Sequence, residues 1–254
     1  MPVKISIITA VYNSEKTLEE ALNSIALQTY TNIEHIVIDG GSTDSSKDIT
    51  ERHLDKIAVY ISEPDKGIYD ALNKGISKAT GDVIGILHAD DTFDNNEVLA
   101  DVANAFEKEQ CDVLYGNLLY VSFEGKIIRD WKSLPFDRKM LSRGWMPPHP
   151  TFFVKREIFA RIGNYNLQYR IASDYDLMLR TLLLPGIRIY YYPQIITRMK
   201  VGGASNRSLK NIIRKSTEDY HIMKRNKVGG CFTLFMKNFS KVGQFFLRKS
   251  KEIE

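Results

Sequence analysis

Cysteine, a signal segment and long apolar runs are scarce or missing in this 254-residue sequence. Its two cysteines, Cys111 and Cys231, lie far apart, which favours buried or incidental thiols in a reducing compartment over a disulfide or a metal site. Residues 1–6 lead directly into a strand pattern, without a basic leader or an apolar signal core. No uninterrupted apolar stretch reaches the roughly 18 residues that a membrane-spanning helix needs. These absences lead us to expect a cytoplasmic protein.

The net charge of +4 is unevenly distributed along the sequence. Residues 207–254 hold 12 lysines and arginines against 4 acids, a net of +8, whereas residues 1–206 hold 23 against 27, a net of −4. An acidic body argues against nucleic acid as a partner, and the basic end indicates a separate electrostatic task. We therefore divide the sequence into one domain over 1–206 and a basic helical tail over 207–254.

Apolar, β-branched runs alternate with helical patterns along the first domain. Strands are predicted over 4–11, 33–39, 57–61 and 84–87, and the segments between them carry apolar residues at helical spacing. This alternation predicts an α/β fold with a right-handed, mostly parallel sheet and helices on both faces. The first strand lacks the Gly-x-Gly-x-x-Gly turn, so the sequence does not carry the dinucleotide-binding fingerprint.

Capping residues and turns predict the boundaries of the other elements. Ser14 can cap the first helix, and Gly81 ends the helix that begins near Ile68. Further patterns predict helices over 98–109, 155–162 and 209–223 and one that starts at 173–174, strands over 111–117, 151–154 and 187–192, and a hairpin over 118–129.

The apolar run over 84–87 leads to two neighbouring carboxylates, Asp90 and Asp91. Such a pair can simply start a helix. However, ligands of open α/β sheets bind where the strands end, and the first two strands bring residues 9–13 and Asp39 to the same edge. Two carboxylates there can hold Mg²⁺ or Mn²⁺, which take few protein ligands and leave positions for phosphate oxygens. The convergence of strand ends favours a ligand site.

Four short motifs together resemble glycosyltransferase family 2, the inverting GT-A fold. They are Val11-Tyr12-Asn13, the turn Asp39-Gly-Gly-Ser-Thr-Asp44, Ala79-Thr-Gly-Asp82 before a strand, and the acidic pair itself. The stretch 62–76, Ser-Glu-Pro-Asp-Lys-Gly-Ile-Tyr-Asp-Ala-Leu-Asn-Lys-Gly-Ile, is similar to bacterial colanic-acid and other exopolysaccharide glycosyltransferases. The resemblance covers residues 4–205 and implies a Rossmann-like GT-A domain.

The resemblance also implies a donor site for a nucleoside-diphosphate sugar. The residues that would border the nucleoside stand at the end of the first strand: Thr9, Ala10, Tyr12 and Asn13. Asp39 would bond the base, and the ribose or diphosphate would lie near Asp65, Lys66 and Asp70. Asp90 would contact the donor and Asp91 would bind Mg²⁺ or Mn²⁺.

Two positions depart from the family pattern. Many relatives have the motif Leu-Asp-x-Asp-Asp, whereas here His88 stands in place of the first of those acids. A histidine at a strand end is more often structural than a ligand. Relatives also often carry an arginine beside the diphosphate, where this sequence has Lys66-Gly67.

The catalytic base implied by the resemblance is Asp174. Relatives commonly have Glu-Asp at the positions of Ser173 and Asp174, so here Ser173 stands in place of the Glu. A carboxylate can remove the proton of the acceptor hydroxyl, although helix capping alone also explains Asp174. Trp145 and His149 lie in a loop-rich region and are candidates for the acceptor sugar, while an ordinary core role is at least as reasonable for the tryptophan.

Phenylalanines recur at helical spacing in the tail. Phe232, Phe235, Phe239, Val242 and Phe246 follow one another at steps of 3, 4, 3 and 4, with Lys237, Lys241 and Arg248 mostly across from them. A helix docked on the body would explain the apolar stripe, and an interfacial membrane helix would explain stripe and charge together. We favour membrane contact over 230–250, at the inner face of the plasma membrane. Residues 201–205 are expected to form a flexible loop that closes over the donor.

The function that these observations indicate is an inverting transfer of one sugar to a hydroxyl of a lipid-linked saccharide, in surface polysaccharide biosynthesis. The Gln-x-x-Arg-Trp motif of processive synthases is absent, which favours single additions. One alternative is a non-catalytic nucleotide-sugar or saccharide-binding module, which would not need Asp174. The other is a sugar-1-phosphate nucleotidyltransferase, which would need a Gly-rich, Arg-bearing loop after the first strand.

Overall fold

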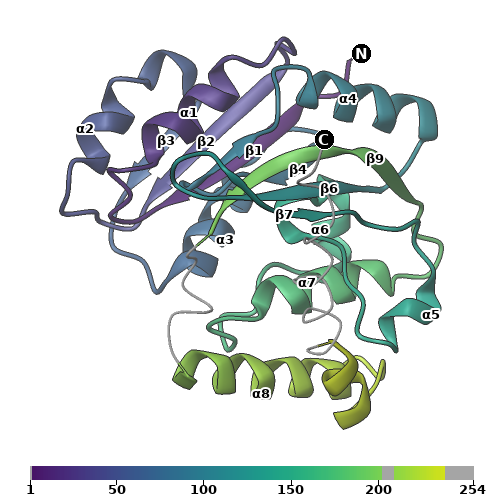
Figure 1. Ribbon diagram of the computed structural model, residues 1–254. Helices are drawn as coiled ribbons and strands as arrows, with labels where there is room; N and C mark the ends of the chain where they lie inside the picture. Colours follow the sequence, from purple (N-terminus) through teal and green to yellow (C-terminus); the bar gives the residue numbers. More distant parts are fainter. Residues whose placement is uncertain (1, 202–208, 238–254) are drawn as a thin grey trace, which may run out of the picture.

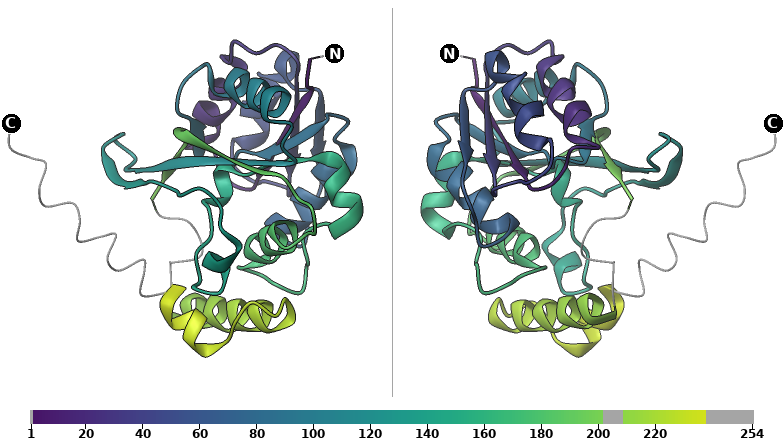
Figure 2. Two further views of the ribbon diagram at one scale, coloured as in Figure 1. Left: turned by 90° about the vertical axis from the view of Figure 1, so that its right-hand side faces the viewer. Right: turned by 90° about the vertical axis from the view of Figure 1, so that its left-hand side faces the viewer.

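The computed structural model describes residues 2–201 and 209–237, which form an α/β body with a further helical layer beneath it (Figures 1 and 2). Within the predicted loop at 201–205, only Val201 is described. The distal part of the phenylalanine stripe, with Phe239, Val242 and Phe246, lies outside the described residues, as do Lys241 and Arg248.

The first half of the sheet is wholly parallel. Its strands stand in the order β3(Val59–Ser62), β2(Ile33–Asp39), β1(Ile5–Val11) and β4(Val83–Ile86). Helices cover both faces, so β1 is buried along its whole length, which explains its continuous apolar run. The predicted α/β class and the four strands are confirmed.

The second half of the sheet mixes directions. Strand β8(Phe153–Lys155) is antiparallel to both β4 and β6(Val113–Val121), and β9(Ile189–Lys200) is parallel to β6. The predicted hairpin is confirmed: the end of β6 pairs antiparallel with β7(Ile127–Trp131). Strand β9 runs eight residues past the predicted end at 192, because its pairing with β6 continues beyond Pro193 through a register shift.

Strand β5(Asp91–Phe93) is the main departure from expectation. A helix start was one explanation for the acidic pair, but the segment after Asp90 pairs antiparallel with residues 197–199 of β9. The helix α4(Val98–Glu109) has the predicted bounds. The pairing partner lies about a hundred residues away in the sequence, so local capping patterns could not show it.

Two groups of helices cover the sheet. One face carries α1(Leu18–Ala26), α2(Ser46–Glu51) and α4(Val98–Glu109), and the other α3(Ile68–Lys78), α6(Arg156–Ile162) and α7(Ser173–Leu182). Shorter elements are η1(Leu54–Lys56), α5(Arg138–Leu141) and η2(His149–Thr151). Ser14 does not act as the predicted side-chain cap, because α1 starts at Leu18 and it is the Ser14 carbonyl that accepts the first N–H groups.

The start of the tail packs on the body. Helix α8(Leu209–Arg225) lies beneath α7 and buries Ile222 and Met223 completely, and residues 231–237 form a further helical turn at its end (Figure 2). The Thr233 hydroxyl donates to the carbonyl of Ser142. These contacts dock α8 and Thr233 on the body, whereas the two described phenylalanines of the stripe, Phe232 and Phe235, are exposed. Within residues 2–201 and 209–237, no helix is both long and apolar enough to cross a bilayer.

Candidate active site

The parallel strands deliver the predicted donor residues to one edge of the sheet. Val11 stands opposite Asp39 in the register of β1 and β2, so both strands end at the same level. Asn13, in a left-handed conformation with φ 48°, receives a hydrogen bond from the Thr43 amide on its Oδ1 (2.9 Å), and its own amide donates to the Ser42 hydroxyl (2.9 Å). Asn13 therefore ties the end of β1 to the turn after β2.

Asp39 holds the loops together at this edge of the sheet, which we call the rim. Its carboxylate is buried, accepts the Ser42 amide at 3.2 Å on each oxygen, and accepts the Ser62 hydroxyl at 2.6 Å. These bonds fix both the turn after β2 and the end of β3. Tyr12, by contrast, is 63% exposed at the end of β1 and is free to cover a flat ligand.

Thr9 and Ala10 are enclosed rather than exposed. The Thr9 hydroxyl is buried and lies 3.1 Å from Nε2 of His35. Burial lowers the pKa of His35 to about 3, so this histidine is neutral and shares an ordinary hydrogen bond with Thr9. The Thr9 side chain is buried against His35 and does not face the rim.

The loop between β3 and α3 is drawn onto the same rim. Asp65 accepts the Gly67 amide (2.7 Å) and Asp70 accepts the Lys66 amide (3.0 Å), which shapes the loop from within. A Cβ on Gly40 would stand 2.3 Å from an Asp65 oxygen, so only glycine lets this carboxylate lie against the backbone after β2. Asp65 thus lies against the turn that follows Asp39, and Lys66 and Asp70 are tied to the same loop.

In the acidic pair, Asp90 is half-buried and Asp91 is buried. Asp91 is 1% exposed, and neither of its oxygens has a hydrogen-bond partner among the described residues. Burial raises the pKa of the Asp91 carboxyl well above its usual range, and the neighbouring charge of Asp90 raises it further. No cluster of three or more metal-ligating side chains occurs in the described part of the chain. Two adjacent carboxylates, one of them unpartnered, suit a Mg²⁺ or Mn²⁺ ion that is completed by phosphate oxygens.

The predicted base lies on the other side of the same site. Asp174 stands in the first turn of α7, where its Oδ1 is 3.2 Å from the Tyr69 hydroxyl and its Oδ2 is 3.5 Å from Nδ1 of His149. Burial pushes the pKa of Asp174 upward, but His149, the Tyr175 amide and Lys215 outweigh it and leave the pKa below its usual value. Asp174 is therefore ionised at neutral pH.

His88 connects the two halves of the site. Its ring lies 5.4 Å from that of His149, and the charges of Asp90 and Asp174 both act on it. Burial nevertheless lowers the pKa of His88, which leaves its ring neutral at pH 7. Asp90, after β4, and Asp174, at the start of α7, are therefore both close enough to this histidine for their charges to act on it.

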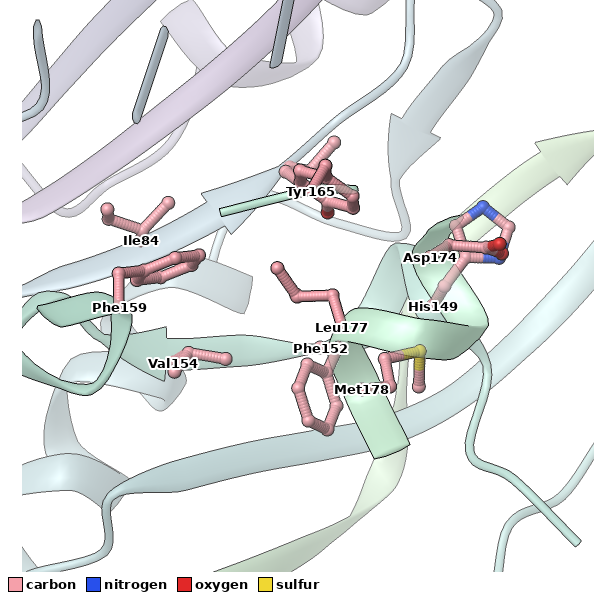
Figure 3. Close-up of a pocket in the computed structure, with 10 residues that line it drawn as sticks. Ile84, His149, Phe152, Val154, Phe159, Tyr165, Asp174, Leu177 and Met178 are labelled. Carbon is pink, nitrogen blue, oxygen red and sulfur yellow. The ribbon is translucent and has the colours of Figure 1, made fainter. Parts of the chain in front are cut away.

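A small cavity lies behind the base. Its volume is about 20 Å³, room for about one water molecule, and Asp174 and His149 stand at its edge (Figure 3). Apolar side chains make up the rest of its wall: Ile84, Ile86, Phe152, Val154, Phe159, Tyr165, Leu177 and Met178. The cavity side of Asp174 is therefore mostly apolar, whereas 29% of its side chain is exposed to solvent.

The two acceptor candidates have different surroundings. His149 reaches the predicted base, as described. Trp145 packs against Tyr115 and Phe136, with ring centroids 5.9 and 6.4 Å away, and belongs to the core that the sequence also allowed.

Residues of α3 support the base in a way that the sequence did not reveal. The Asn73 amide exchanges two 2.9 Å hydrogen bonds with the backbone of Tyr165, and the ring of Tyr69 stacks on that of Tyr165 at 5.4 Å. Tyr69 and Asn73 lie four residues apart, on one face of the helix, which could have marked them as a pair. Their partners, about a hundred residues away, could not have been read from the sequence.

Several proteins of known fold are similar to this chain. A structure of S. aureus TarS 1–349 in complex with UDP-GlcNAc superposes with a TM-score of 0.69 at 21% identity, over 89% of this chain and 66% of that one. The chain spans only 39% of the longer TarS chain. The mannosyltransferase PcManGT from Pyrobaculum calidifontis, in complex with GDP-Man and Mn²⁺, gives a TM-score of 0.67 at 19% identity over 94% of this chain and 70% of that one. These likenesses confirm the predicted GT-A type of fold.

Sequence relatives define the family. A PGL/p-HBAD biosynthesis glycosyltransferase of Mycobacterium bovis (strain BCG / Pasteur 1173P2) is 34% identical over 207 residues, which cover 79% of this chain and 78% of that protein. Residues 6–163, which contain the rim and the acidic pair, match the family described as glycosyl transferase family 2. The chain therefore belongs to glycosyltransferase family 2 and is a glycosyltransferase.

Proposed function

We propose that this glycosyltransferase moves one sugar, with inversion, from a nucleoside-diphosphate sugar to a hydroxyl of a lipid-linked saccharide, in surface polysaccharide biosynthesis. The observation that carries the proposal is the series of contacts from Asp174 to His149 (3.5 Å) and from the His149 ring to that of His88 (5.4 Å), two residues before Asp90. A single displacement needs the donor diphosphate and the base on opposite sides of one reacting carbon, and an acidic pair and a base on separate elements suit this requirement. The complexes of TarS with UDP-GlcNAc and of PcManGT with GDP-Man and Mn²⁺ support the donor class and the divalent ion.

On the donor side, the residues of the rim bind and orient. Tyr12 covers the base, while Asn13 and Asp39 hold the turn that shapes its pocket. The loop with Asp65, Lys66 and Asp70 borders the ribose and diphosphate, and Lys66 supplies positive charge there. Asp91, with Asp90 beside it, would hold Mg²⁺ or Mn²⁺. When bound, the ion would neutralise charge on the departing diphosphate.

On the acceptor side, Asp174 takes the proton. The acceptor oxygen forms a bond to the anomeric carbon, the bond from that carbon to the diphosphate oxygen breaks, and the hydroxyl proton passes to the Asp174 carboxylate. His149 and Tyr69 lie within 3.5 Å of its two oxygens and keep the carboxylate turned toward the rim. A low pKa keeps Asp174 ready to accept a proton at neutral pH.

A thermal-shift screen tests the donor class. We expect UDP-GlcNAc or GDP-mannose to raise the melting temperature in the presence of Mn²⁺, because a ligand at 100 times its Kd stabilises the native state by about 2.7 kcal/mol. EDTA should remove most of the shift. If neither nucleotide sugar shifts the melting temperature, the proposed donor site is wrong, and if EDTA changes nothing, the metal is not needed.

The described part of the tail supports contact with an anionic membrane that presents a lipid-linked acceptor. Both acids of α8, Glu218 and Asp219, point toward the body, where they bind backbone amides and Lys237. The exposed charges of this helix are therefore basic, and they include Lys210, Lys224 and Arg225. Large apolar side chains also stand out from this layer: Ile213 (66% exposed), Phe232 (73%) and Phe235 (61%). Charge and exposed apolar area together suit an anionic lipid surface.

Sedimentation with phosphatidylglycerol vesicles tests the membrane contact. An inserted phenylalanine contributes about 1.5–3 kcal/mol and each nearby basic residue about 1 kcal/mol. The double variant Phe232→Ser/Phe235→Ser should therefore bind at least about tenfold more weakly than the parent, and high salt should release the parent. Leu27→Ser, at an exposed apolar position of the opposite face, is the matched control.

Point variants are a sharper test than truncation after Gly229. Truncation would also remove Lys237, which pairs at 2.8 Å with the buried Asp219, and so would disturb the body. Equal vesicle binding by the parent and the double variant would contradict membrane contact through this surface.

A further inference from the structure

The carboxylate of Glu218 on α8 holds the backbone just before the proposed base. Its Oε1 accepts the amide of Arg170 at 3.0 Å, and its Oε2 accepts the amides of Ile171 and Ala172, each at 2.9 Å. Ala172 is the residue that precedes the first turn of α7, and Asp174 follows two positions later. One side chain therefore satisfies three consecutive N–H groups at the entry to this helix.

Glu218 holds the segment before α7, a helix that lacks a side-chain cap of its own. Ala172, at the N-cap position, has no side chain that could accept a hydrogen bond. The hydroxyl of the next residue, Ser173, donates instead to the carbonyl of Asn166 at 2.9 Å. A negative charge at a helix N-terminus is favourable, and hydrogen bonds to a carboxylate are stronger than neutral ones.

The same backbone segment is held from the opposite side by α3. The Tyr69 hydroxyl donates to the carbonyl of Ile171 at 2.7 Å and lies 3.2 Å from the Asp174 carboxylate. Residues 170–172 thus lie between Tyr69 and Glu218. A shift of this segment would carry Asp174 with it.

Glu218 is itself fixed in place by its neighbour. Asp219 is buried and pairs with Lys237 at 2.8 Å, and the Lys237 ammonium lies 3.1 Å from the centre of the Tyr175 ring. Tyr175 directly follows the proposed base. The tail therefore contacts the chain on both sides of Asp174.

We propose that Glu218 is a positioning residue for the base, and that α8 is thereby part of the active site and not a separate tail. This inference rests on the proposed role of Asp174. It predicts a loss of turnover with no loss of donor affinity, because the donor residues lie on β1, β2 and the loop before α3, away from α8.

The test compares Glu218→Ala and Glu218→Gln with the parent in Mn²⁺-dependent hydrolysis of UDP-GlcNAc or GDP-mannose, whichever the thermal-shift screen selects. We expect Glu218→Ala to lower kcat about 10- to 100-fold, since a misplacement on the order of 1 Å can cost about 100-fold. Glu218→Gln keeps one acceptor oxygen and should lose less. Donor Kd should stay within about twofold, and amide exchange of residues 171–174 should accelerate. The matched control is Thr217→Ala, because this exposed residue of the same turn bonds only within its helix through the Ile213 carbonyl.

A double-mutant cycle separates positioning from general stability. In an Asp174→Asn background, Glu218→Ala should lower kcat by less than about twofold further, because the group that it positions is already gone. Independent, multiplying effects of the two changes would overturn the inference, and so would parent-level kcat in Glu218→Ala. Unfolding of both Glu218 variants would assign this residue a structural role alone. Full turnover by the single variant Asp174→Asn would instead overturn the proposed base, and it is detected before Glu218 is changed.

Discussion

Replacing Asp174 with asparagine is expected to slow sugar transfer by about 10²- to 10⁴-fold, the range typical for loss of a general base. Asparagine has nearly the same size and can still interact with the Tyr69 hydroxyl and His149. It cannot accept the proton of the acceptor hydroxyl. Folding and donor binding should therefore survive while turnover falls. Turnover is measured as release of the nucleoside diphosphate, and donor affinity by thermal shift.

The matched control for this experiment is Asp48→Asn. Asp48 also stands in the first turn of a helix, α2, but on the opposite face of the sheet and exposed to solvent. Its replacement removes a similar favourable charge at a helix N-terminus without touching the site. Transfer by Asp174→Asn within a few-fold of the parent would leave Asp174 as an ordinary first-turn acid of α7.

The second large effect is expected at Asp91, where stability and donor binding should change in opposite directions. Asp91→Asn should weaken Mn²⁺-dependent donor binding by on the order of 10- to 100-fold, as expected for a lost interaction with a charged group. It should also raise the free energy of unfolding at neutral pH, because the buried Asp91 carboxyl must take up a proton that the unfolded chain has lost, and asparagine avoids this cost.

The pH dependence follows from the direction of the pKa shift. The folded state raises the pKa of Asp91, so it keeps this proton at pH values where the unfolded chain has already lost it. The contribution of Asp91 to stability is therefore complete below the unfolded pKa of about 4, and it is lost as pH rises toward the folded pKa. Asp91→Asn should not show this loss. Urea unfolding of parent and variant across this pH range, without metal, measures the difference.

Two further variants help to interpret the Mn²⁺-dependent donor binding of Asp91→Asn. Asp55→Asn removes an exposed carboxylate beside Lys56 and should change neither stability nor Mn²⁺ dependence. Asp90→Asn tests the half-buried neighbour. Retained Mn²⁺-dependent binding in Asp91→Asn together with its loss in Asp90→Asn would move the ion to Asp90, and retention in both would show that the acidic pair does not hold it.

The parts of the structure that could be predicted from the sequence depend on short-range signals. The runs that became β1, β2 and β4 are β-branched and apolar because helices cover them on both faces. Asp39 and Asp90 stand at the ends of these runs, and parallel strands end at one edge, so it was predictable that these residues share an edge of the sheet. The identity of the base required more, because periodicity alone left Asp174 as a cap. Its role came from the resemblance to the family and remains a prediction.

Other features depended on partners that are distant in the sequence. Residues 91–93 form a strand because they pair with β9, although their local pattern allowed a helix start and predicted no strand. The Thr9 side chain contacts His35 on the neighbouring strand and is buried. A continuous apolar run does not show which way the side chain of a given residue points.

The sequence by itself determined the α/β class, the first four strands and the edge of the sheet where Asp39 and Asp90 lie. The reason is that helix and strand periods, caps and strand-end turns act over a few residues to about a dozen. Tertiary structure alone decided how the base is held. Tyr69 meets Asp174 across 105 residues, and Glu218 meets Ala172 across 46. Such bonds form only after the sheet and its helices have packed and brought the partners together, so no local pattern of residues encodes them.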